Sequence, residues 1–203
     1  MKASDIFIGL VDFFSTLLPG MLLVAGFPAS TFVKLWGTRD AAAEWGMPKW
    51  AVLVVAGYVI GQLLHLLGAK LANWVYPSLL RRFKPHNFDA VSELATAVLS
   101  TAFPETSGAE ITRRSEAVVK HLSPDLGVEL ERLEAAAKFA RGLSLVALIL
   151  AGHAAALCNW TAMVLWFVTA LCAFVRFIDR RLIHNRYACE LVVISTSFAK
   201  AKA

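Results

Sequence analysis

The longest apolar part of the chain is the stretch from Gly142 to Ile178, in which only His153 and Arg176 carry an ionisable group other than a thiol. As a single helix this stretch would be about 55 Å long, at 1.5 Å per residue, which far exceeds the roughly 30 Å hydrocarbon core of a bilayer. The tripeptide Cys158-Asn159-Trp160 is the natural place for a break. The pattern therefore predicts a helical hairpin that crosses a membrane twice, with almost no loop between its arms.

Two further apolar segments precede this hairpin. The segment Ile6–Phe27 predicts a first membrane span, with a kink at Pro19-Gly20 because proline removes a backbone donor. A signal peptide is the alternative interpretation, but Asp5 and Asp12 do not fit one. The segment from Trp50 to about Ala72 predicts a second span. Between the two, a polar loop with a short helix at 40–45 is expected, flanked by tryptophans typical of a membrane interface: Trp36, Trp45 and Trp50.

The charged middle of the chain predicts three helices in water. The first is expected from just after Asn87 to Ser100. A capping-box pattern at Ser107-Gly-Ala-Glu110 predicts the start of the second, which reaches about His121. The third starts at Ser123-Pro124-Asp125, where a capping serine precedes a proline at the first helical position. Nothing from Leu126 to Leu157 interrupts the third helix, so it is predicted to run straight into the third span.

After the hairpin, the charges of Asp179-Arg180-Arg181 mark an exit from the membrane. The tail is predicted to be an amphipathic helix, because apolar residues recur at helical spacing: Tyr187, Leu191, Ile194 and Phe198. The predicted fold class is all-α, a polytopic membrane protein with four transmembrane helices, a cytosolic helical insert between spans two and three, and an amphipathic C-terminal helix. The expected regions are 1–75 (spans one and two with an external loop), 76–141 (cytosolic helices), 142–178 (hairpin) and 179–203 (cytosolic helix).

Composition and charge support this class and orient it. Of the 203 residues 58% are hydrophobic and mean hydropathy is +0.60, too apolar for an ordinary soluble domain. The net charge is +5, and lysine and arginine are more numerous in the middle region, with ten from Lys70 to Arg141, and in the tail, with six from Arg176 onward, than in the first loop, with three. This distribution predicts that the middle region, the tail and the N-terminus face the cytoplasm. The basic clusters at the predicted membrane exits are Arg81, Arg82, Lys84, Arg180 and Arg181. Nucleic acid is not an expected partner.

One face of the second span combines small and polar residues, namely Gly57, Gly61, Gln62, His65 and Gly68. Small residues at this spacing let helix backbones approach closely in lipid. This face is therefore predicted to pack helices or to line a pore, and a homo-oligomer is expected. His65 is an intramembrane functional candidate, whereas His153 is interpreted as a neutral imidazole bonded to a neighbouring helix. The spans offer too few ligands for a metal, and the three cysteines imply neither a disulfide framework nor a zinc site.

Arg81 and His86 have the R-x4-H spacing of HEPN-type ribonucleases, in which histidine acts as acid or base and arginine holds phosphate. The alternative is a basic stop followed by a turn, because Pro85 disfavours a continuous helix across the pair. No Walker loop, GxSxG, HExxH or dinucleotide fingerprint is present. The sequence therefore predicts a protein that is not an enzyme and uses no cofactor, with a membrane-tethered ribonuclease as an alternative.

The pattern D-I-F-x3-V-D-F-F-x3-L-P-G at 5–20, followed by G-Y-V-I-G-Q-L-L-H at 57–65, resembles small four-span bacterial membrane proteins. Relatives of that design are effectors or accessories of anti-phage defence systems of the CRISPR or CBASS type. The R-x4-H spacing is similar to a divergent HEPN motif proposed for one such accessory. The resemblance implies an oligomer that opens the inner membrane when a cytosolic partner signals infection. The alternative is a non-conducting membrane anchor or adaptor that recruits a soluble partner.

Overall fold

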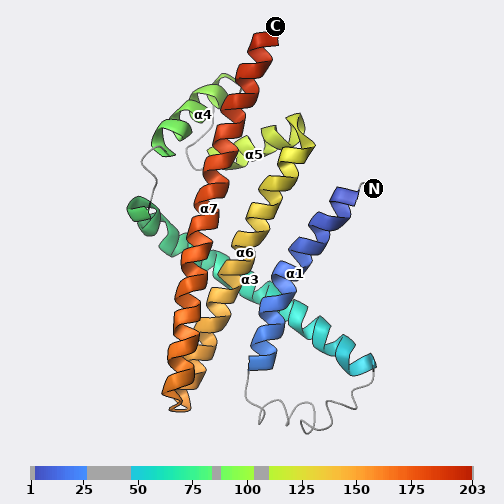
Figure 1. Ribbon diagram of the computed structural model, residues 1–203, viewed down its shortest axis with the longest axis vertical. Helices are drawn as coiled ribbons and strands as arrows, with labels where there is room; N and C mark the ends of the chain where they lie inside the picture. Colours follow the sequence, from blue (N-terminus) through green and yellow to red (C-terminus); the bar gives the residue numbers. More distant parts are fainter. Residues whose placement is uncertain (1–2, 27–46, 84–87, 103–109, 203) are drawn as a thin grey trace. The chain divides into compact units, whose positions relative to one another are not determined.

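The computed structural model describes residues 3–26, 47–83, 88–102 and 110–202, which form helices joined by short turns and contain no strand (Figure 1). The all-α class is confirmed. The helices are α1 (Ala3–Gly26), α3 (Met47–Phe83), α4 (Phe88–Ala102), α5 (Ile111–Leu122), α6 (Pro124–Ala156) and α7 (Trp160–Lys202). The helix expected at 40–45, with Trp36 and Trp45, lies outside the described residues.

The break between α6 and α7 lies where the sequence predicts it. Cys158 has a φ of 54°, and the amides of Cys158 and Asn159 donate back to the carbonyls of Ala155 and Ala154, both at 2.9 Å. These bonds form a Schellman motif, which closes a helix through one residue in the left-handed conformation. The Asn159 side chain then accepts a hydrogen bond from the amide of Ala162 at 3.2 Å and caps α7. The hairpin therefore needs only three residues to reverse the chain.

The start of α6 is also as predicted, and the start of α5 is not. Pro124 is the first residue of α6, and the amide of Ser123 closes α5 on Val119 at 2.8 Å. However, α5 begins at Ile111 with Glu110 as its N-cap, and the Glu110 side chain makes no capping bond. It pairs instead with Arg114 at 2.9 Å, one turn along the helix. Ser107, the serine of the predicted capping box, lies outside the described residues.

The chain divides into two compact units. The apolar unit consists of Gly9–Val75 and Lys138–Phe177, and the charged unit of Met1–Ile8, Tyr76–Ala137 and Ile178–Ala203. These boundaries fall close to the ends of the apolar segments in the sequence. Because α6 and α7 are continuous helices, each contributes residues to both units. The predicted C-terminal helix is thus not separate: the charges at 179–181 end the apolar segment without ending the helix.

The core of the apolar unit is built from four helices. Leu64 of α3 packs with Val146 and Leu150 of α6, and residues of α1 and α7 lie against them, among them Leu22 and Trp166. The arms of the hairpin run antiparallel, side by side (Figure 1). Large apolar side chains also point outward from α3 and α7, as expected for helices that face lipid: Val52, Val55, Val59, Leu63, Leu66, Leu67, Val164, Leu165, Val168, Leu171 and Val175.

Three described helices are long and apolar enough to cross a membrane, not four. Their candidate spans are Trp50–Leu71, Asp125–Ala156 and Trp160–Ile194. Among the residues whose side chains are described, α1 contributes a shorter apolar stretch, Phe13–Ala25, about 20 Å at 1.5 Å per residue. The predicted class of membrane protein is supported, and the count of four spans is corrected to three in the described residues.

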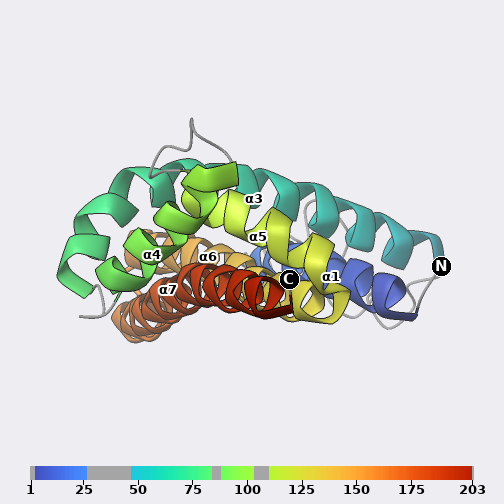
Figure 2. The same cartoon turned by 90° about the horizontal axis from the view of Figure 1, so that it is seen from above.

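The core of the charged unit joins α4, α5, α6 and the C-terminal part of α7 (Figure 2). Leu99, Val119, Leu130 and Val192 each come from a different one of these helices and are at most 2% exposed. On α7 the buried face continues through Ala188, Cys189 and Leu191, whereas Ile194, which the sequence places on the apolar face, is half exposed. The charged unit therefore has its own hydrophobic core, independent of lipid.

Candidate functional site

The glycine face of α3 lies against α1. A Cβ built on Gly20 would overlap the carbonyl oxygen of Gly57 and come within 2.7 Å of the amide nitrogen of Gly61. A Cβ on Gly61 would in turn overlap the carbonyl oxygen of Thr16. Backbones this close require glycine, as at other small-residue crossings in membranes. The predicted packing face is thus occupied within one copy of the chain.

Next to this crossing, Arg141 of α6 contacts His65 of α3. Its Nη2 lies 3.2 Å from Nδ1 and 3.3 Å from Nε2 of the imidazole, and its guanidinium carbon lies 5.9 Å from the centroid of the Phe177 ring. A guanidinium can only donate, so a ring nitrogen of His65 must accept, which requires a neutral imidazole. The aliphatic part of Arg141 packs on Gly68, where a Cβ would lie 3.3 Å from its Cγ. Arg141 thereby ties α6 to α3 and α7.

A cavity of about 230 Å³ opens beside Arg141. Its walls come from α3, α6 and α7 and are apolar except for Arg141 and Ser144, whose hydroxyl donates to the carbonyl of Ala170 at 3.0 Å. The remaining lining residues are apolar side chains and one glycine: Gly68, Leu71, Val75, Leu145, Leu148, Phe167, Ala170, Leu171 and Phe174.

The other predicted site residues are placed as follows. Gln62 donates to the hydroxyl of Tyr58, one turn earlier on α3, at 2.9 Å. Arg180 and Arg181 lie on α7 within the charged unit. Arg81 and Arg82 belong to the last turn of α3, but their side chains are not described, and Lys84 and His86 lie outside the described residues. The ribonuclease pair Arg81–His86 therefore stays a prediction.

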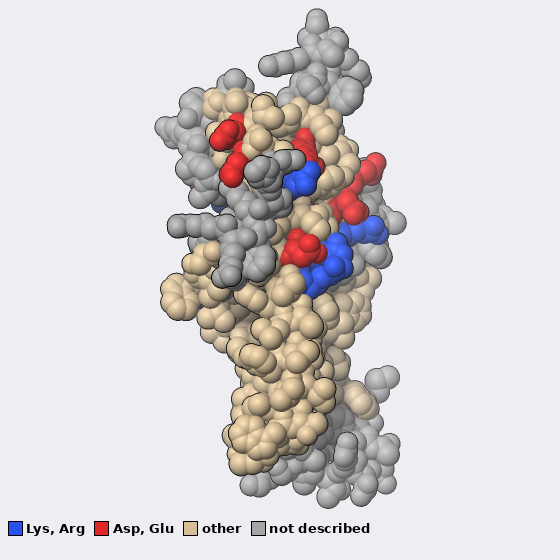
Figure 3. Space-filling view, turned by 60° about the vertical axis from the view of Figure 1, so that its left-hand side comes forward, with Lys and Arg blue, Asp and Glu red and all other residues tan. Residues whose placement is uncertain are grey.

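Acidic and basic side chains of the charged unit form a small network. Lys120 of α5 pairs with Glu116 at 3.0 Å and with Glu131 of α6 at 2.8 Å. Partial burial would by itself lower the pKa of Lys120, but hydrogen bonds and attraction from Glu131 and Glu116 outweigh it, so the pKa lies above the ordinary 10.5. Lys120 is therefore protonated at neutral pH. On the face drawn in Figure 3, the described charged side chains gather in one region and another region shows none.

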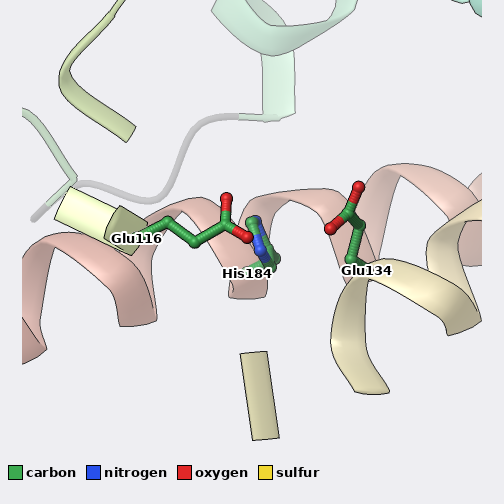
Figure 4. A group of neighbouring side chains, drawn as sticks. All are labelled: Glu116, Glu134 and His184. Carbon is green, nitrogen blue, oxygen red and sulfur yellow. The ribbon is translucent and has the colours of Figure 1, made fainter. Parts of the chain in front are cut away.

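Beside this network Glu116, Glu134 and His184 converge from α5, α6 and α7 (Figure 4). Their ligand-type atoms all lie within 4.8 Å of one another. The sequence gives no signal for this group, because the three residues lie on separate helices and share no motif spacing. One feature points to His184 itself. This histidine lies in a charged segment, and Leu182 and Ala188, which are close to it on α7, are core residues.

The fold and these sites define an all-helical protein with three described helices that could cross a membrane and a separate charged helical unit. No family model matches the sequence, and no curated protein or solved structure is significantly similar to it. The resemblance to membrane proteins of anti-phage systems therefore stays a prediction.

Proposed function

We propose that this protein lies in a bacterial inner membrane and, as a homo-oligomer, controls the permeability of that membrane. The observation that carries the proposal is the course of α6, a single helix from Pro124 to Ala156. Its first part carries charged residues up to Arg141, and the remainder contains no Asp, Glu, Lys or Arg. A continuous helix transmits a displacement from one end to the other, so an event at the charged residues moves the apolar segment.

The distribution of lysine and arginine favours a cytoplasmic location for both termini and the charged unit, and hence for a soluble protein partner. The resemblance noted above supports defence against phage as the biological setting.

The contact between Arg141 and His65 is the polar element through which we expect gating to act. Ionisable residues within membrane helices are costly and are usually functional. Losing one hydrogen bond to a charged group, about 1.5 kcal/mol, shifts a two-state equilibrium roughly tenfold.

The proposal predicts that purified protein in liposomes releases an entrapped dye and that His65→Ala and Arg141→Leu each change the release rate about tenfold. His153→Ala is the matched control, because it removes another histidine of the apolar unit that does not contact Arg141, and we expect it to release dye like the wild type. Efflux is measured by fluorescence dequenching. An intact wild-type protein that releases no dye would contradict the proposal.

A non-conducting membrane anchor is the second candidate. It is favoured by the occupation of the Gly57–Gly61 face by α1, which makes that face unavailable to a second copy. In this case the mass of the detergent-solubilised particle corresponds to one chain and liposomes stay tight. A soluble partner then copurifies in a fixed ratio with the full chain.

A further inference from the structure

His184 is a deeply buried ionisable residue in the described part of the charged unit. The residue is 1% exposed, and its Nε2 atom is buried without a hydrogen-bond partner among the described residues. Its Nδ1 atom lies 3.4 Å from the side-chain oxygen of Asn185. Because that oxygen can only accept, the proton belongs on Nδ1 and a lone pair remains on Nε2. A buried lone pair without a donor costs free energy unless something occupies the site.

The carboxylates next to His184 supply the oxygen ligands that a cation site needs. Glu116 and Glu134 lie on either side of the imidazole ring (Figure 4), with their ligand-type atoms within 4.8 Å of the histidine and of each other. Lys120 pairs with Glu116 and with Glu131. The carboxylates of Glu116 and Glu134 and the guanidinium of Arg181 all act electrostatically on His184.

We propose that Glu116, Glu134 and His184 bind a divalent zinc ion. One nitrogen and two carboxylate oxygens suit zinc, whereas magnesium and calcium prefer oxygen ligands alone. Asn185 fulfils the role of the outer partner that fixes the tautomer of a ligating histidine. The site is independent of the proposed control of permeability.

The geometry requires only side-chain adjustment to accept the ion. Ligand atoms of a tetrahedral zinc site lie about 3.4 Å apart, given bonds of about 2.1 Å, so atoms within 4.8 Å of one another must approach by up to about 1.4 Å. Both carboxylates end flexible glutamate side chains that are partly exposed. Glu116 also pairs with Lys120 at 3.0 Å, and the ion competes with that ammonium. Three protein ligands leave a fourth position open to water. The ion would join α5, α6 and α7.

The test is zinc binding by the full chain in detergent, purified through a tag without histidines. We expect saturable binding of one zinc ion per chain in calorimetric titration and in elemental analysis after desalting. Glu116→Gln, Glu134→Gln and His184→Gln should each weaken binding by at least tenfold, since even outer partners of zinc ligands contribute about 10- to 100-fold. Glu131→Gln is the matched control, because it removes a carboxylate that pairs with Lys120 without removing a ligand.

Two results would overturn the proposal. The first is a wild-type chain with no saturable site, and the second is a Glu131→Gln variant that loses as much affinity as the ligand variants. If a ligand variant fails to fold, cobalt(II) added to the wild-type chain decides the question. Visible absorption bands of cobalt in a low-coordinate site, bleached by one equivalent of zinc, are expected, and their absence refutes the site.

Discussion

Replacing Gly61 by alanine is expected to destabilise the apolar unit by about 3 kcal/mol, because overpacking a tight contact typically costs 1–3 kcal/mol and occasionally more. The new methyl group would overlap the carbonyl oxygen of Thr16, which is backbone and cannot rotate away. The helices α1 and α3 must then separate, and Gly20→Ala should act in the same way. The thermal unfolding midpoint of the detergent-solubilised protein measures the effect.

Gly152→Ala is the control for this prediction. Gly152 also lies inside a helix of the apolar unit, but a Cβ there would have no atom within 4 Å. Alanine is favoured over glycine in a helix interior by about 1 kcal/mol, so this variant should be slightly more stable than the wild type. The two substitutions are chemically identical and have opposite expected signs. Equal midpoints for Gly61→Ala and Gly152→Ala would show that α1 and α3 do not approach as closely as described.

The second large effect is expected at Arg141. Arg141→Leu removes both its contact with His65 and its position over the Phe177 ring. Each of Arg141→Leu and His65→Ala is expected to cost about 1.5 kcal/mol, the range for a hydrogen bond to a charged group. Because the two side chains share one contact, the double variant should cost less than the sum by about 1 kcal/mol, within the range of polar pairs in membrane helices.

This coupling can be measured by titration with a denaturing detergent, as the change in unfolding free energy for each variant. Arg176→Ala serves as the comparison, because it removes an exposed arginine of α7 in the same unit. Combined with His65→Ala it should give an additive result. Full additivity between Arg141→Leu and His65→Ala would instead mean that their contact contributes nothing to stability.

Local signals in the sequence predicted the helix boundaries well where a specific residue enforces them. Asn159 caps α7 through its side chain, and Pro124 stands at the first position of α6, where its missing amide proton is not needed, so the starts of α6 and α7 were predictable. Charges proved a poorer guide to helix ends. The cluster at 179–181 ends the apolar segment, but α7 continues because arginine is a good helix former and no glycine or proline follows.

Sites that depend on tertiary contacts were predicted only in part. His65 was recognisable as a polar residue within an apolar span, but its partner Arg141 looked like the last residue of a cytosolic region. The Gly57–Gly61 spacing predicted close packing and did not reveal that α1 is the neighbour. Glu116, Glu134 and His184 come from three helices, and their meeting depends on how those helices pack.

The three cysteines of this chain lie in different surroundings. Cys158 is exposed in the turn of the hairpin, Cys172 is exposed on the apolar part of α7, and Cys189 is buried in the core of the charged unit. A thiolate forms readily only where water reaches the sulfur. A polar, membrane-impermeant maleimide should therefore modify the native chain in intact cells at Cys158 alone, if the turn faces outward. Labelling of Cys158 thus reports on which side of the membrane the hairpin turn lies.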